Sequence, residues 1–265
     1  MKLKNQPEGA DRLMTWDDTF CFRCHPGVEC YNSCCKDVTI FLNPLDIGRL
    51  RKALGITSTE FLARYTDIVV SPTTGVPAVV LKMRSEDEKR CPFVTEEGCL
   101  VYVQRPYSCR LYPLDTEQGV EFRLLVDGAR CKGLLETDQR TVEEWRREQG
   151  LLDYDDMDHN LKDVMNPDQI WEDKIHDPRM QDMILMTLYD PDRFREFIFD
   201  SSFLTKFQVD EDILQKIRED DVALLYFGSQ WLRFALFGDK GFLKINRDYL
   251  LKKTREIREG QVKEL

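Results

Sequence analysis

The feature that most constrains this chain is a dense group of cysteines near its N-terminus. The stretch CFRCHPGVECYNSCC, residues 21–35, contains five of the nine cysteines of the 265-residue chain, and two of the five are adjacent. All nine lie between Cys21 and Cys131. A chain of this length can bury a sizeable core without disulfide bonds, so packing does not explain this density. The thiols are therefore expected to hold each other, a metal or a substrate.

The expected compartment favours metal over disulfides. The first residues, MKLKNQPEGADRLMTW, lack the apolar stretch of a secretory signal, so we expect a cytoplasmic protein. Clustered cysteines in a reducing cytosol are typical of metal ligands or redox groups. Nine is also an odd number, so the cysteines cannot all pair within the chain.

Composition argues against membrane and nucleic-acid partners. The most apolar segment, VALLYFGSQWLRFALFG, is interrupted by Gln230 and Arg233, so it is predicted to be a core helix and not a membrane span. Residues 1–140 carry 19 Lys and Arg against 20 Asp and Glu, and the remaining residues carry most of the formal charge of −10. Neither half has the basic surface that binds nucleic acid.

The chain is predicted to be α+β and mostly helical. A cysteine-cluster domain is expected over 1–140, and a helical acidic region over 141–265. Pro44 and Gly55 are predicted to begin and end a helix, and capping-box patterns at Thr57/Glu60 and Thr141/Glu144 begin two more. Short strands are expected within VTIFL, VPAVVLKM and VEFRLLVD, and further helices within PDRFREFIFDSSFL and DILQKIRED. The acidic DYDDMDHN lacks the glycine and terminal Glu of a calcium loop and is interpreted as the beginning of a helix.

The cysteine spacing indicates thiolate chemistry but does not identify the metal. Soft thiolates select zinc, Cu(I) or iron–sulfur clusters. A zinc ribbon needs two CxxC knuckles, and only Cys21 and Cys24 form one. The bacterial ferredoxin run CxxCxxCxxxCP is also absent. The irregular spacing favours an iron–sulfur cluster over zinc. The expected cofactor is an iron–sulfur cluster, taken to be [4Fe–4S], or zinc.

Two further patterns bear on the site. Adjacent side chains of an extended segment point to opposite sides, so Cys34 and Cys35 can serve two sites, or one site through a bent backbone. Arg105 and Arg110 flank Cys109 in RPYSCR and are predicted to bind the cofactor, because four thiolates around a metal leave negative charge. The same two arginines are also compatible with a nucleophilic Cys109, which needs more assumptions.

The sequence resembles a known family. The motifs are the CC doublet followed by VTIFLNPLDIGRL, then CPFVTEEGCLVYVQRPYSCRLYP, and finally CKG. Together they resemble the YkgJ-type cysteine-cluster family, described as zinc- or iron-chelating proteins, over roughly residues 20–135. The resemblance implies eight metal ligands, with Cys21 outside the set: Cys24, Cys30, Cys34, Cys35, Cys91, Cys99, Cys109 and Cys131. The first group is wider here than the family's CxxCGxCC. Eight ligands would fill two four-cysteine sites, or one cluster and a smaller site.

Three functions remain open at this point. The first is a metal-binding protein that holds an iron–sulfur cluster or zinc and works in electron transfer or in redox or metal sensing. The second is an iron–sulfur-dependent enzyme that modifies proteins or peptides, since flagellin lysine N-methylases have a similar cysteine cluster. The third is an interaction module held by structural zinc, with a protein partner on the acidic half. The chain has no Rossmann glycine motif, P-loop or nucleophile elbow, so no catalytic residue is assigned.

Overall fold

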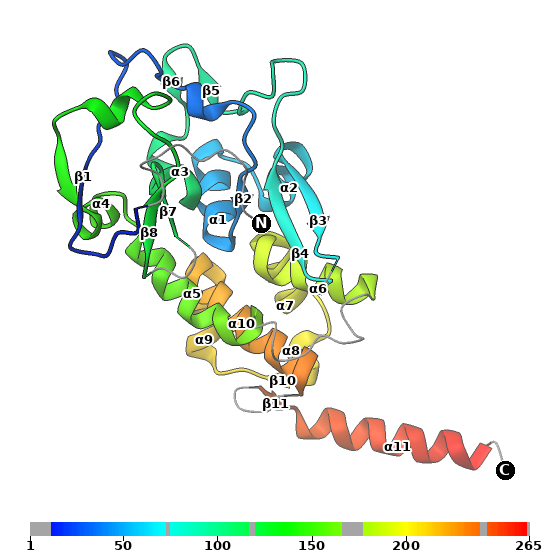
Figure 1. The fold of residues 1–265 in the computed structure, drawn as a ribbon. Helices are drawn as coiled ribbons and strands as arrows, with labels where there is room; N and C mark the ends of the chain where they lie inside the picture. The colour runs from blue at the N-terminus through cyan, green and yellow to red at the C-terminus, as the bar shows by residue number, and fades with distance from the viewer. Residues whose placement is uncertain (1–11, 73–74, 117–119, 166–176, 239–242, 264–265) are drawn as a thin grey trace. The chain divides into compact units, whose positions relative to one another are not determined.

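The fold is mostly helical with small sheets, which confirms the predicted α+β class. The computed structural model describes residues 12–72, 75–116, 120–165, 177–238 and 243–263 (Figure 1). The α-helices are α1 (Pro44–Leu54), α2 (Ser58–Tyr65), α3 (Tyr107–Leu111), α4 (Val142–Glu148), α5 (Leu152–Met165), α6 (Pro178–Tyr189), α7 (Pro191–Phe199), α8 (Phe203–Lys206), α9 (Glu211–Glu219), α10 (Asp221–Phe237) and α11 (Arg247–Lys263). Short 3-10 helices are η1 (Ser33–Cys35), η2 (Tyr102–Gln104) and η3 (Lys132–Leu135).

The strands are short and form sheets of two or three. They are β1 (Thr19–Cys21), β2 (Phe41–Leu42), β3 (Thr66–Val70), β4 (Pro77–Leu81), β5 (Val94–Thr95), β6 (Gly98–Cys99), β7 (Leu114–Thr116), β8 (Phe122–Leu124), β9 (Gln139–Thr141), β10 (Phe207–Gln208) and β11 (Lys244–Ile245). The paired strands are β1–β9, β5–β6, β7–β8 and β10–β11, and the three-stranded sheet has the order β2-β4-β3. The predicted strands correspond to β2, β4 and β8, each shorter than its apolar segment.

Helix α1 begins and ends where its sequence predicts. The Asn43 side chain accepts a hydrogen bond from the Asp46 amide, and the Asp46 carboxylate accepts one from the Asn43 amide, which together form a capping box. Pro44 occupies the first turn, where a missing N–H costs nothing. Gly55 ends the helix at a φ of +66°, a conformation that glycine adopts without a Cβ clash.

The other predicted capping signals also lie at helix starts. Thr141 and Glu144 form a complete capping box at the start of α4, as predicted. At α2, the Glu60 amide donates to the Thr57 hydroxyl at 3.1 Å, as the predicted pattern requires. The acidic stretch DYDDMDHN lies in α5, in agreement with its interpretation as helix.

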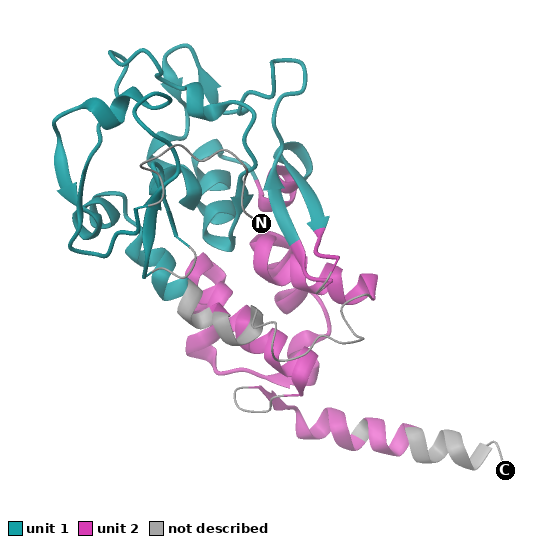
Figure 2. Ribbon diagram, viewed as in Figure 1, with its two compact units in different colours: residues 1–56, 63–69, 78–158 teal, residues 57–62, 70–77, 159–265 magenta. Residues whose placement is uncertain are grey.

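The chain divides into two compact units (Figure 2). Unit 1 comprises residues 1–56, 63–69 and 78–158, and unit 2 comprises residues 57–62, 70–77 and 159–265. Helix α4 and the first part of α5 follow residue 140 in the chain, but they belong to unit 1. The predicted domains 1–140 and 141–265 remain a prediction.

In unit 1, the pairing of β1 with β9 joins the first and last parts of the cysteine region. Phe20 of β1 lies opposite Arg140 of β9. Trp145 of α4 packs edge-on against Phe20 and Phe22, with ring centroids 6.1 and 5.3 Å apart. Because β1 directly precedes Cys24 and β9 follows η3, this pairing brings the two ends of the cysteine region side by side.

Unit 2 is built from helices around an apolar and aromatic core. The predicted apolar helices are found as α7 with α8, α9 and α10, and α10 packs against α6, α7 and α9. The buried core residues are Met186, Phe194, Ile198, Phe203, Ile217, Leu224, Phe227, Trp231 and Leu243. Among the described residues, no helix combines the length and apolarity needed to cross a membrane.

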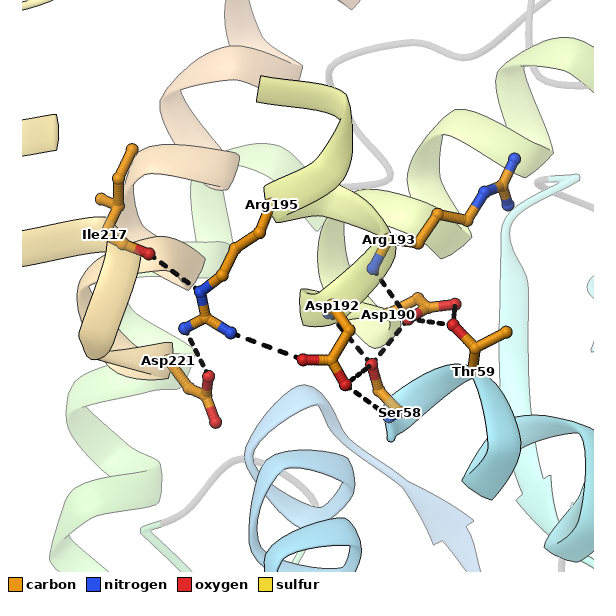
Figure 3. A network of polar contacts seen from close by, with 8 residues as sticks. All are labelled: Ser58, Thr59, Asp190, Asp192, Arg193, Arg195, Ile217 and Asp221. Atoms are coloured by element: carbon orange, nitrogen blue, oxygen red, sulfur yellow. Dashed lines mark hydrogen bonds and ion pairs between the residues drawn. The ribbon is translucent and has the colours of Figure 1, made fainter. Parts of the chain in front are cut away.

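A buried polar network within unit 2 joins the start of α2 to the start of α7 (Figure 3). The Ser58 hydroxyl lies 2.6 Å from an Asp190 carboxylate oxygen, and the Ser58 amide donates to Asp192 at 2.7 Å. In return, the Asp192 amide donates to the Ser58 hydroxyl at 3.0 Å. Thr59 donates to Asp190 as well. The network satisfies the free amides of two helix starts, so it fixes residues 57–62 within unit 2.

Arg195 extends this network to α9 and α10. Its guanidinium donates to the Ile217 carbonyl at 3.0 Å and pairs with Asp221 at 2.6 Å (Figure 3). A longer contact of 3.7 Å joins it to Asp192. One side chain therefore links the start of α7 with the end of α9 and the beginning of α10.

Ser58→Ala is expected to destabilise the protein by about 1–3 kcal/mol, because it leaves buried hydrogen-bonding groups of Asp190 and Asp192 without the hydroxyl. Ser85→Ala is the matched control, since Ser85 is exposed and its hydroxyl donates to the neighbouring Glu86, which lies on the surface as well. Denaturant unfolding followed by circular dichroism measures both. Equal stability of the two variants would contradict the structural role of Ser58.

Candidate metal centre

Separate segments of unit 1 carry the eight predicted ligands. Cys24 and Cys30 lie in the turns after β1, and the doublet forms the end of η1. Cys91 precedes β5, and Cys99 ends β6. Cys109 lies in α3, and Cys131 precedes η3. All nine cysteines of the chain are free thiols in this structure.

Six of the eight line one cavity of about 430 Å³ in unit 1: Cys24, Cys34, Cys35, Cys91, Cys99 and Cys109. Apolar and aromatic side chains form much of the remaining wall, among them Phe22, Ile40, Phe93, Val94, Val101 and Trp145. The cavity therefore gathers soft donors in a largely apolar surrounding.

Cys30 and Cys131 are not among the cavity-lining residues, but they lie next to each other. The Cys30 sulfur accepts a hydrogen bond from the Lys132 amide at 3.1 Å, which places it beside the backbone of Cys131. The hydroxyl of Tyr112, a cavity-lining residue, interacts with the Cys131 thiol. These two thiols thus adjoin the cavity at Tyr112.

Cys21 and His25 lie within the cysteine region but are not among the eight predicted ligands. Cys21 ends β1 and lines a different cavity, of about 350 Å³, together with Met14 and Leu134. His25 lines the cysteine cavity, where its Nδ1 accepts from the Gly27 amide at 3.1 Å. This hydrogen bond stabilises the turn that follows His25.

Burial raises the pKa of five of these thiols above that of a free cysteine. It is the largest influence on Cys24 and Cys109, and with the charges of neighbouring cysteines it raises the pKa of the two thiols to about 11 and about 12. Burial also raises the pKa of Cys91, Cys99 and Cys131. A thiol that ligates a metal is deprotonated. The positive charge of a bound metal ion would therefore lower the pKa of these thiols and stabilise their thiolate forms.

The doublet behaves differently from the other thiols because its two members interact. A hydrogen bond from the Cys35 thiol lowers the pKa of Cys34 to about 7. The same hydrogen bond raises the pKa of Cys35. Cys34 is therefore the thiol of this pair that ionises first.

Arg105 lies at the cavity, as expected for a residue that interacts with an anionic centre. Its guanidinium stacks on Tyr102 at 4.0 Å and donates to the Tyr102 carbonyl at 2.7 Å. Burial raises the pKa of Cys24 and of Cys99, and the positive charge of Arg105 opposes this rise at both thiols. Its cofactor-binding role remains a prediction.

Arg110 is placed differently. It is buried, and its guanidinium donates to the backbone carbonyls of Arg105, Gln149 and Val103. It is not among the residues that line the cavity. In this position it fixes the loop that carries Arg105, and a direct contact with a cofactor stays a prediction.

Asp46 was not predicted as a site residue, yet it positions the segment that carries Cys109. Its buried carboxylate accepts hydrogen bonds from the Tyr107 amide at 2.9 Å and from the Tyr154 hydroxyl at 2.7 Å. Tyr107 begins α3, so α1 holds the helix that contains Cys109. No local pattern in the sequence indicates this role, because Tyr107 and Tyr154 lie more than 60 residues from Asp46.

Asp46→Asn is expected to lower the free energy of unfolding by about 1–3 kcal/mol, because an amide NH₂ would face a backbone donor. Burial raises the pKa of Asp46 from 3.8 to about 6, so the folded protein binds this proton more tightly than the unfolded chain. The carboxyl therefore favours the folded state most at a pH below 3.8. That contribution is lost as the pH rises to about 6. The free energy of unfolding of the wild-type and Asp46→Asn proteins is measured across this pH range. It should fall less steeply with rising pH in the variant. Identical slopes would contradict the burial effect.

The donor set fits a thiophilic metal, although the side chains are not in a coordination arrangement. Within the part of the chain that the structure describes, no three His, Cys, Asp or Glu side chains are placed so that they could hold a metal ion. The thiols nevertheless converge on one cavity and its edge, and their chemistry suits zinc or iron. Binding would require the sulfur atoms to move closer together.

Comparison with known proteins agrees with this assignment. Residues 23–133 match the model of the CxxCxxCC family, whose description is "Putative zinc- or iron-chelating domain". The matched segment contains all eight predicted ligands and leaves out Cys21. No curated protein and no solved structure matches the chain. Over residues 23–133 the chain is therefore similar to a zinc- or iron-chelating domain of the CxxCxxCC family.

Proposed function

We propose that this protein holds an iron–sulfur centre through the cysteine thiolates of unit 1 and uses it in electron transfer or redox sensing. The observation that supports the proposal is the single cavity to which six cysteines contribute, with Cys30 and Cys131 beside it. One structural zinc ion takes four ligands, so this number of thiols exceeds a single zinc site.

The surroundings of the thiols also favour a redox centre. The wall of the cavity includes the aromatic rings of Phe22, Phe93 and Trp145. Apolar enclosure and limited access of water are among the factors that set the potential of an iron–sulfur cluster. A cationic guanidinium, that of Arg105, lies at the same cavity and would stabilise the negative charge of a thiolate-bound cluster.

Anaerobic purification followed by an absorption spectrum and analysis of iron, zinc and acid-labile sulfide tests this function. Matching iron and sulfide, with a broad visible charge-transfer band that bleaches on reduction, is the expected result. Stoichiometric zinc without sulfide would overturn the redox role and leave a structural or metal-sensing domain. Absence of both metals, with all thiols free to react, would overturn metal binding itself.

A further inference from the structure

We propose that the eight cysteines form two separate four-thiolate centres and that the doublet divides between them. The first centre comprises Cys24, Cys30, Cys34 and Cys131, and the second comprises Cys35, Cys91, Cys99 and Cys109. This division rests on one part of the proposed function, namely that the thiolates bind metal. It applies equally to zinc and to iron–sulfur clusters, because each is held by four thiolates.

The first centre is assembled where the start and the end of the cysteine region meet. The Arg23 amide donates to the Gly133 carbonyl at 3.0 Å. A Cβ on Gly133 would lie 2.8 Å from the Arg23 carbonyl oxygen, so only glycine permits this approach of the two backbones. Cys24 follows Arg23, and Cys131 lies two residues before Gly133. The contact therefore brings the loops that carry these two cysteines together.

Successive turns add the other two thiols to the first centre. The Cys30 sulfur accepts from the Lys132 amide at 3.1 Å, and the Ser33 amide donates to the Cys30 carbonyl at 2.9 Å. The second bond closes the turn that leads into Cys34. Electrostatic interactions agree with the grouping, because the Cys24 thiol is influenced by those of Cys34, Cys131 and Cys30.

The second centre is assembled around the β5–β6 hairpin. The Cys91 amide donates to the Cys35 carbonyl at 2.8 Å, so these two residues are neighbours through the backbone. The Val94 amide donates to the Cys91 carbonyl, and Val94 lies opposite Cys99 in the hairpin. The hairpin thus returns Cys99 toward Cys91.

Helix α3 completes the second centre. The Arg105 Nε donates to the Cys109 carbonyl at 3.4 Å, which ties Arg105 to the helix that carries Cys109. The Cys109 thiol interacts electrostatically with those of Cys91 and Cys99, and the Cys35 thiol with those of Cys91 and Cys109. All four residues of this centre line the cavity.

The doublet places the two centres next to each other. Cys34 and Cys35 share a hydrogen bond between their side chains, and the charge of Cys34 also acts on Cys99 and Cys109. Asn32, at a φ of +63°, turns the chain just before η1. Neighbouring residues that ligate two centres would couple them, so that filling or reducing one centre influences the other.

Titration of the reduced, metal-free full-length protein with Co²⁺ alone, under anaerobic conditions, tests the division. The thiolate-to-cobalt charge-transfer band reports occupancy of a thiolate site. The wild-type protein is expected to bind two equivalents. Cys99→Ser and Cys131→Ser should each bind one, with circular dichroism confirming that the variants are folded. Cys21→Ser is the matched control and should bind two.

Paired variants make the division itself falsifiable. Cys30→Ser with Cys131→Ser removes two ligands of one centre and should still leave one equivalent. Cys99→Ser with Cys131→Ser removes one ligand from each centre and should leave none. Loss of both equivalents in the first pair, or a wild-type protein that binds a single equivalent, would overturn the two-centre division while metal binding stands. A wild-type protein that binds no Co²⁺ would instead overturn the proposed function.

Discussion

Cys35→Ser is expected to lower the bound metal and to destabilise unit 1 substantially. Structural zinc contributes on the order of 10 kcal/mol to folding in small domains, and a lost ligand removes a large part of such a contribution. Unit 1 is expected to need a bound metal, because its strands of two to five residues form only small sheets, joined by long irregular segments. Elemental analysis and thermal unfolding of the purified variant measure the two effects.

Cys21→Ser is the control for this prediction, since Cys21 lines a different cavity and lies outside the matched domain. It should keep full metal content and the wild-type melting temperature. A Cys35→Ser protein with unchanged metal and melting temperature would remove Cys35 from the ligand set. Loss of metal in Cys21→Ser would add Cys21 to that set.

Phe194→Ala is expected to lower the free energy of unfolding by about 3–5 kcal/mol, the usual cost of a large cavity in a core. Phe194 is fully buried in unit 2, and its ring stacks on Phe197 with centroids 6.2 Å apart. A Cβ on Gly228 would lie only 3.1 Å from the Phe194 ring, which shows how closely α7 and α10 pack. Urea unfolding followed by circular dichroism measures the loss.

Phe237→Ala provides the comparison for Phe194→Ala. Phe237 ends α10 and is 40 % exposed, so its truncation removes less buried surface and should cost far less stability. Metal content should stay at the wild-type level in both variants, because neither residue belongs to unit 1. A Phe194→Ala protein as stable as Phe237→Ala would contradict the assignment of Phe194 to the core.

Much of the secondary structure could be predicted because its signals are local. Pro44 and Gly55 bound α1, and Thr141 begins α4 with a complete capping box. Each signal acts within one helical turn, so a single sequence contains it. Strands were less predictable in length, since β2 has two residues where the apolar segment VTIFL has five. The length of a strand depends on its partner.

The compact units illustrate what long-range contacts decide. Residues 57–62 belong with the C-terminal helices because Ser58 and Thr59 bind Asp190 and Asp192, more than 130 residues away. Nothing near Ser58 in the sequence indicates these partners. Long-range contacts of this kind, which no change of composition indicates, place residues 57–62 in unit 2.

For the candidate site, the chemistry is predictable from residue type alone, because clustered thiols select soft metals. The match of residues 23–133 to the model of a zinc- or iron-chelating domain agrees with this prediction. Tertiary structure decided which thiols meet. The contact of Arg23 with Gly133, the β5–β6 hairpin and the Asp46 carboxylate that holds α3 join segments far apart in the chain. The proposed grouping of the eight cysteines rests on these contacts, because the spacing of cysteines along the chain does not specify the distances between loops that only folding brings together.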